Sequence, residues 1–203
     1  MALNLPLSKP GDTHVPLKLN LAKGERFTVE LAWDSKHDLD AHCLLMEDTG
    51  AGNKVTSMEK VLSTYNSRKT NRSGVLVTNP NGSFSTPCGS LTHSGDARDG
   101  TLTGVDETIT IEGSKVPMNI VEIPIFVTIH PASSGLFKDV KEATIKIKDD
   151  SGKELCSFRL TSEFASFNAV QMGSLLVGAN GWEFSAVGVG FNGDFNSVLG
   201  SFS

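Results

Sequence analysis

The stretch Arg26–Trp33, with the sequence RFTVELAW, decides the fold class. Its large apolar side chains stand at every second position: Phe27, Val29, Leu31 and Trp33. Since side chains alternate between the two faces of a strand, this period of two predicts a β-strand with one buried and one solvated face. Strands of that kind are typical of antiparallel sheets. The same alternation recurs in residues 107–112 and 142–148.

Turn residues separate the predicted strands. Asp150-Ser151-Gly152 lies between 142–148 and a further strand-like run at 154–160, and Asn180-Gly181 precedes another. Asn-Gly is a strong hairpin signal because a type I′ turn needs positive φ at both central residues. The run Ile120–His130 is more continuously apolar and predicts a central strand, in which Pro124 requires an edge or a bulge.

These signals predict a mainly β protein: a two-sheet antiparallel β-sandwich with short helical turns, near 115–119 and 162–168. We expect one domain over residues 1–203, which is within the size range of single all-β domains. Residues 67–103, rich in Ser, Thr, Asn, Gly and Pro, predict a long irregular insertion, and the Gly- and Ser-rich tail 190–203 is expected to be flexible.

The charge balance excludes several classes of partner. The chain has 18 basic and 23 acidic residues, a net charge of −5, and residues 34–112 carry 7 basic and 11 acidic groups. Bulk electrostatic binding to nucleic acid is therefore not expected. Neither an apolar run long enough to cross a membrane nor a signal peptide is visible, so we expect no direct membrane insertion and a cytoplasmic location. Three cysteines without a Cys-x-x-Cys motif fit thiols in a reducing compartment.

The first acidic cluster directly follows the predicted strand at residues 26–33. If residues 39–45 form a strand, Leu39, Ala41, Cys43 and Leu45 point to the core. Asp38, Asp40 and His42 then share the opposite face, with the two carboxylates about 7 Å apart along the strand. Their repulsion would be relieved by a divalent cation.

The second acidic cluster lies in a glycine-rich loop, residues 93–107. It contributes four carboxylates: Asp96, Asp99, Asp106 and Glu107. Calcium takes six to eight oxygen ligands in irregular geometry, which such a loop can supply, whereas zinc favours His and Cys. Either cluster alone is also typical of a solvated loop, and neither has the EF-hand spacing.

Two other functions are compatible with the same residues. A metal-assisted hydrolase could use the carboxylates together with His42 or His93 as acid–base groups. A calcium-dependent membrane-docking module could use exposed Leu102 and Arg98 at its loop tips. The chain has none of the common catalytic motifs that would name a reaction, and His130, before Pro131, is expected to be structural.

In order along the chain, several motifs resemble the TerD family of tellurite-resistance and calcium-binding stress proteins. They are Asp38-Leu39-Asp40-Ala41, Tyr65-Asn66, Ser94-Gly95-Asp96-Ala97, Gly104-Val105-Asp106-Glu107, the strand FVTIH at 126–130 and WEFSAVGVG at 182–190. The resemblance implies a non-catalytic, calcium-binding sandwich active in tellurite and chemical stress and in phage resistance. It also implies partners among other stress-response proteins, in a membrane-associated complex.

By motif position, the resemblance implies that Asp38, Asp40, Asp96, Asp106 and Glu107 are calcium ligands, with Asp99 as an additional acidic residue nearby. The chain departs from the family pattern at three positions: Ala97 replaces a common Asn, and Val105 and Thr103 replace acidic residues. We therefore expect one retained calcium site, or weaker binding, in place of two sites.

Overall fold

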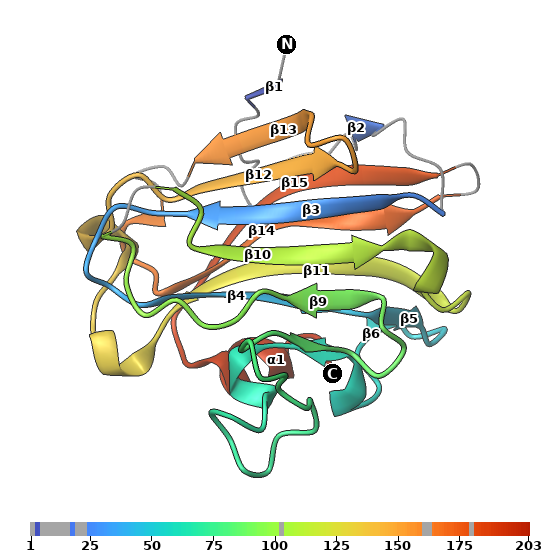
Figure 1. Cartoon of the computed structure of the whole chain (residues 1–203), viewed down its shortest axis with the longest axis horizontal. Coiled ribbons are helices and arrows are strands. Elements are labelled where there is room, and N and C mark those ends of the chain that lie inside the picture. Colours follow the sequence, from blue (N-terminus) through green and yellow to red (C-terminus); the bar gives the residue numbers. More distant parts are fainter. Residues whose placement is uncertain (1–2, 5–16, 19–23, 102–103, 160–163, 179–180) are drawn as a thin grey trace.

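The computed structural model describes residues 3–4, 17–18, 24–101, 104–159, 164–178 and 181–203. These residues form two β-sheets that face each other, with most strands running across the view in Figure 1. The prediction of a mainly β, two-sheet sandwich is confirmed. No helix in the described part of the chain is long and apolar enough to cross a membrane.

The first sheet is built around strand β3, which residues 26–32 of the alternating stretch form. Its order is β1 (Leu3–Asn4), β13 (Glu154–Arg159), β12 (Thr144–Asp149), β3 (Arg26–Ala32), β10 (Glu107–Glu112), β9 (Leu91–His93) and β8 (Phe84–Ser85). Its pairs are antiparallel except that β1 runs parallel to β13. The predicted alternation is visible in β3 and β10, where every second residue is buried.

The second sheet carries the more apolar strands. Its order is β2 (Leu17–Lys18), β15 (Trp182–Phe191), β14 (Ala169–Val177), β11 (Ile120–Ile129), β4 (Leu39–Leu44) and β7 (Val61–Leu62). Beyond the end of β4, β5 (Met46–Asp48) pairs with β11, and β6 (Asn53–Lys54) pairs with β5.

Pro124 lies in the middle of the central strand β11, and two irregularities accommodate it. The neighbour of β11 changes from β4 to β5 at this point, and the register against β14 shifts between Ile125 and Phe126. Proline lacks the N–H that a regular ladder requires, and of the edge or bulge predicted from the sequence the structure has a bulge, one residue beyond Pro124.

The main core fills the space between the sheets. Trp33 is buried there, as the alternation in residues 26–33 predicts. Trp182 is buried there too, and its ring packs edge-on against Phe27 at 5.5 Å between centroids. Cys43 is a buried free thiol whose pKa burial raises, which fits its predicted role as a small apolar residue. Burial of this continuous apolar cluster is the main driving force for folding.

A second, smaller apolar cluster covers the outer face of the second sheet. Helix α1 (Phe195–Gly200) contributes Phe195 and Val198 to it, and Asp194 caps the helix by accepting from the backbone N–H of Ser197. The backbone N–H of Val55 donates to the carbonyl of Phe202 at 2.7 Å. The tail after residue 190 is thus held by packing and hydrogen bonds, although it was expected to be flexible.

The segment 67–103 is partly structural. It forms β8 and β9 and places Leu76, Phe84 and Leu91 in the main core. The 3₁₀ turns of the described chain are Met58–Lys60, Thr64–Asn66, Gly113–Lys115, Pro131–Ser133 and Phe137–Asp139. The turn expected at 115–119 lies slightly earlier, at 113–115, and part of the turn expected at 162–168 lies outside the described residues, as does Asn180.

Candidate metal centre

Strand β4 positions the first two carboxylates of the site. Leu39, Ala41 and Cys43 point into the main core, so Asp40 lies on the outer face of the second sheet. Asp38 lies just before the strand, where its backbone N–H donates to Ser133 Oγ and its carbonyl accepts from the backbone N–H of His130. These two backbone hydrogen bonds fix Asp38 beside the end of β11.

Asp40 is nearly inaccessible, with a relative exposure of 1 %. Thr64 Oγ1 donates to Oδ1 at 2.7 Å and Tyr65 Oη donates to Oδ2 at 2.9 Å. Both hydroxyls come from the 3₁₀ turn Thr64–Asn66, which Ser63 caps by accepting from the backbone N–H of Tyr65. Burial raises the pKa of Asp40, while the two hydroxyl hydrogen bonds oppose the shift.

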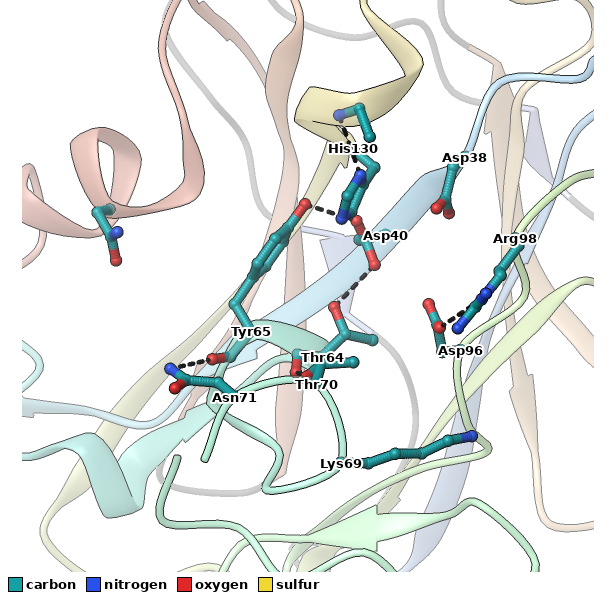
Figure 2. A pocket seen from close by; sticks show the side chains of 12 residues that line it. Asp38, Asp40, Thr64, Tyr65, Lys69, Thr70, Asn71, Asp96, Arg98 and His130 are labelled. Atoms are coloured by element: carbon teal, nitrogen blue, oxygen red, sulfur yellow. Dashed lines mark hydrogen bonds and ion pairs between the residues drawn. The ribbon is translucent and has the colours of Figure 1, made fainter. Parts of the chain in front are cut away.

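Asp96 reaches the same point from the loop between β9 and β10. Asp38, Asp40 and Asp96 each contribute one carboxylate oxygen to a cluster. The three oxygens lie within 4.8 Å of one another. Figure 2 shows these three side chains facing one another across a pocket. Arg98 Nε lies 3.6 Å from Asp96 Oδ2, at the solvent side of the group.

The electrostatics of this cluster favour a bound cation. The pKa of Asp38 is raised to about 6 by burial, then by the negative charges of Asp40 and Asp96. Asp38 Oδ1 is buried and has no hydrogen-bond partner in the described part of the chain. An unpartnered buried carboxylate oxygen beside two further carboxylates is stabilised by a hard divalent cation. The donor set therefore fits calcium.

Glu107 was predicted as a ligand, but the structure does not bring it into this group. It is 1 % exposed, and its Oε2 accepts from the backbone N–H of Ala41 at 2.7 Å. Oε1 accepts from the backbone N–H of Ala97 at 3.3 Å, and His93 Nε2 lies 3.3 Å from Oε2. Burial raises the pKa of Glu107, and the neighbouring His93 opposes that shift. Through these two hydrogen bonds Glu107 links Ala41, which follows Asp40, to Ala97, which follows Asp96.

The other two predicted ligands also lie apart from the three clustered carboxylates. Asp106 Oδ2 accepts from the backbone N–H of Trp33 at 3.0 Å, which joins the loop to the end of β3. Asp99 is exposed, and its Oδ1 accepts from both the backbone N–H and the hydroxyl of Thr101. Both carboxylates therefore have structural hydrogen-bond partners away from the three clustered carboxylates. Of the departures from the family motif, Val105 is exposed, and Thr103 lies outside the described residues.

The two histidines considered as acid–base groups are fully buried. His42 Nε2 lies 2.9 Å from Thr128 Oγ1, and burial lowers the pKa of His42 well below its usual value. His93 Nδ1 accepts from the backbone N–H of Gly95, so its position is a structural one. A general acid or base must reach its substrate, and neither ring lines the pocket. The alternative of a calcium-dependent membrane-docking module named Leu102 and Arg98 as loop-tip residues. Leu102 lies outside the described residues, and Arg98 pairs with Asp96.

The pocket beside the carboxylates is a polar cavity of about 770 Å³. Its lining comes from five parts of the chain: Asp38 and Asp40; Thr64, Tyr65, Lys69, Thr70 and Asn71; Asp96 and Arg98; His130 and Ala132; and Asn196. His130, expected to be structural, accepts from the backbone N–H of Ala132 and also lines this cavity. The ring of Tyr65 is stacked between His130 and Phe195.

Sequence reasoning missed most of the lining outside the acidic clusters. Tyr65 and Asn66 appeared only as a family motif, and the structure gives each a separate role. Tyr65 holds Asp40, whereas Asn66 donates to the carbonyls of Met58 and Val61 and so fixes the preceding loop. Lys69 and Asn71 carried no sequence signal at all.

A TerD domain model matches residues 5–202. The chain therefore belongs to the TerD family. It is 30 % identical to the tellurium resistance protein TerD of Alcaligenes sp., over 98 % of this chain and 97 % of that protein. It is 31 % identical to TerZ of Serratia marcescens over 74 % of this chain, a match that spans 65 % of TerZ.

A third relative is the general stress protein 16U of Bacillus subtilis, 36 % identical over 52 % of this chain and 56 % of that protein. The fold is shared with the crystal structure of a homologue of telluride resistance protein TerD from Streptomyces coelicolor. That comparison has a TM-score of 0.64 and 20 % identity, and covers 86 % of this chain and 95 % of the other. The relatives thus carry the names of resistance and stress proteins.

Proposed function

We propose that this protein is a calcium-binding, non-catalytic module of a chemical stress response. The observation that carries the proposal is the convergence of Asp38, Asp40 and Asp96 on one point, with a buried Asp38 oxygen that lacks a partner among the described residues. The names of its relatives support the stress-response part of the proposal: two of them name tellurium resistance and one names general stress.

Calcium binding would act on the loops more than on the sandwich. Asp40 lies in β4, Asp38 directly precedes that strand and Asp96 lies in the β9–β10 loop, and Asp40 also holds the 3₁₀ turn at Thr64–Asn66. A cation between them would remove their mutual repulsion and fix the relative positions of these segments. We propose that the ordered loop surface is then recognised by other stress-response proteins in the cytoplasm, in a membrane-associated complex.

Thermal unfolding tests the calcium part of this proposal. A ligand that binds only the folded state raises the free energy of unfolding by RT ln(1 + [L]/Kd), about 2.7 kcal/mol at 100 times Kd. We expect millimolar calcium to raise the midpoint of unfolding by several degrees relative to EGTA. We expect Asp40→Asn to abolish that rise. A midpoint that is the same in calcium and in EGTA would contradict the proposal.

A further inference from the structure

The cavity at the candidate metal centre is too large for an ion alone. A water molecule occupies about 30 Å³ of liquid volume, so a cation with a few waters fills only a fraction of the cavity's approximately 770 Å³. With one oxygen each, as the cluster brings them together, the three carboxylates also supply fewer ligands than the six to eight oxygens that calcium takes. The remaining coordination positions would face the cavity.

Two cationic side chains line the same cavity. Figure 2 shows Lys69 extending beneath Asp96, with its ammonium group on the same side as the guanidinium of Arg98. Lys69 has no ion-pair partner within the described chain, whereas Arg98 Nε lies 3.6 Å from Asp96 Oδ2. If a divalent cation binds Asp96, the guanidinium of Arg98 loses part of its partner and can turn its donors to another oxygen group.

The charge of the loaded cavity is suited to an anion. Three carboxylates, one divalent cation and the side chains of Lys69 and Arg98 leave a formal charge of +1. The neutral part of the wall offers further hydrogen-bonding groups, the amides of Asn71 and Asn196. We propose that this cavity binds a small molecule with an anionic oxygen group, a phosphate monoester or a carboxylate. In the calcium-loaded protein, the side chains of Lys69 and Arg98 would hold that group next to the cation site.

This inference rests on the proposed calcium site, and it predicts a coupling between two ligands. The anion meets three carboxylates when the cation is absent and a positive site when it is present. Thermodynamic linkage then requires that the anion raise calcium affinity by the same factor by which calcium raises anion affinity. We expect a factor of about tenfold, which is within the usual range of coupling between two ligands.

Isothermal titration calorimetry on the full chain tests the coupling. Glycerol 3-phosphate is titrated into calcium-loaded protein and into protein in EGTA, and glycerol is the uncharged control. Acetate in a parallel titration represents the carboxylate class. We expect glycerol 3-phosphate or acetate to bind the loaded protein about tenfold more tightly than the protein in EGTA. The anion that shows this difference identifies the class of ligand, and glycerol gives no signal.

Charge-removing variants locate the anion. We expect Lys69→Ala and Arg98→Ala each to weaken anion binding to the calcium-loaded protein several-fold. Arg72→Ala is the matched control because Arg72 is exposed on the same segment and does not line the cavity. The inference is overturned if calcium binds but neither anion does. It is overturned equally if anion affinity is the same in EGTA, or if Lys69→Ala and Arg98→Ala behave like Arg72→Ala. Absence of calcium binding would instead overturn the proposed function.

Discussion

Asp40 and Glu107 are both buried carboxylates, yet their hydrogen-bond partners differ in kind. Asp40 accepts from two hydroxyl groups and points toward the cavity, whereas Glu107 accepts from two backbone N–H groups behind it. A hydroxyl can donate or accept, but a backbone N–H can only donate. Asp40 can therefore lose its charge without leaving a partner unpaired, and Glu107 cannot. This difference separates a candidate ligand from an anchor of the site.

Glu107→Gln gives the largest expected loss of stability. An amide offers one acceptor oxygen in place of two, so the N–H of Ala41 or of Ala97 is left facing an NH₂ group. An unsatisfied buried N–H costs about 1–3 kcal/mol, and we expect a loss of about 2 kcal/mol or more. Urea unfolding in EGTA measures it.

The matched control for this variant is Glu112→Gln, at the other end of the same strand. Glu112 is part-exposed and pairs with Arg26, so its change is expected to stay within about 0.5 kcal/mol. If Glu107→Gln left stability unchanged and removed calcium binding, Glu107 would be a ligand and the assignment as an anchor would be wrong.

Asp40→Asn is expected to have a small effect on stability and a large effect on calcium affinity. Thr64 and Tyr65 can rotate their hydroxyls to suit an amide, and the variant removes one charge from a group of three carboxylates. We expect the free energy of unfolding in EGTA to change by less than about 1 kcal/mol. Calcium affinity should fall by at least about 100-fold, because loss of a direct ligand should cost more than the roughly 10- to 100-fold typical for loss of an outer-shell partner. A large destabilisation with calcium affinity preserved would reverse the two roles.

The pH dependence of calcium binding follows from Asp38. Its pKa in the folded protein is about 6, above the usual value of 3.8, so between these values the folded state holds a proton that the unfolded state has released. Without calcium, this group therefore lowers stability as pH rises from about 4 to about 6, and contributes no further change above that range.

Calcium needs the deprotonated form of Asp38, so its affinity should rise about tenfold between pH 5 and pH 7 and then level off. Calcium titrations at four pH values and constant ionic strength measure this profile. A flat profile from pH 5 to pH 8 would exclude Asp38 from the site.

The smallest effect is expected for Asp99→Ala. The carboxylate is exposed, and among the described residues its hydrogen bonds go to Thr101 alone. Stability should change by less than about 0.5 kcal/mol, and calcium affinity by less than about twofold. Loss of calcium affinity comparable to that of Asp40→Asn would show that Asp99 joins the ion in the loaded protein.

The fold and half of the candidate site could be predicted from local patterns. Alternation of residue types places strand faces, and the same rule put Asp38 and Asp40 on one side of β4. The same rule also predicts the position of Glu107. It stands two residues before Ile109 and four before Ile111, which are buried, so its side chain points inward as theirs do.

The remaining features depend on contacts between segments far apart in the chain. Lys69 and His130 reach the cavity from separate loops, and no local spacing predicts which loops meet. Phe84 and Leu91 are single apolar residues within a polar segment, and Leu76 lies in a run of only three apolar residues, so their burial in the core was not visible as a period. Helix α1 is only six residues long and lies in a Gly- and Ser-rich tail, and packing of Phe195 and Val198 holds it in place.

The most direct test of the account is calcium calorimetry on the wild-type chain, Asp40→Asn and Glu107→Gln. Glu107→Gln is measured under conditions in which it is folded. The account predicts one calcium ion per wild-type chain, no measurable binding to Asp40→Asn, and weakened binding to Glu107→Gln with the stoichiometry unchanged. Calcium binding to Asp40→Asn with wild-type affinity, or no binding to the wild-type chain, would contradict it.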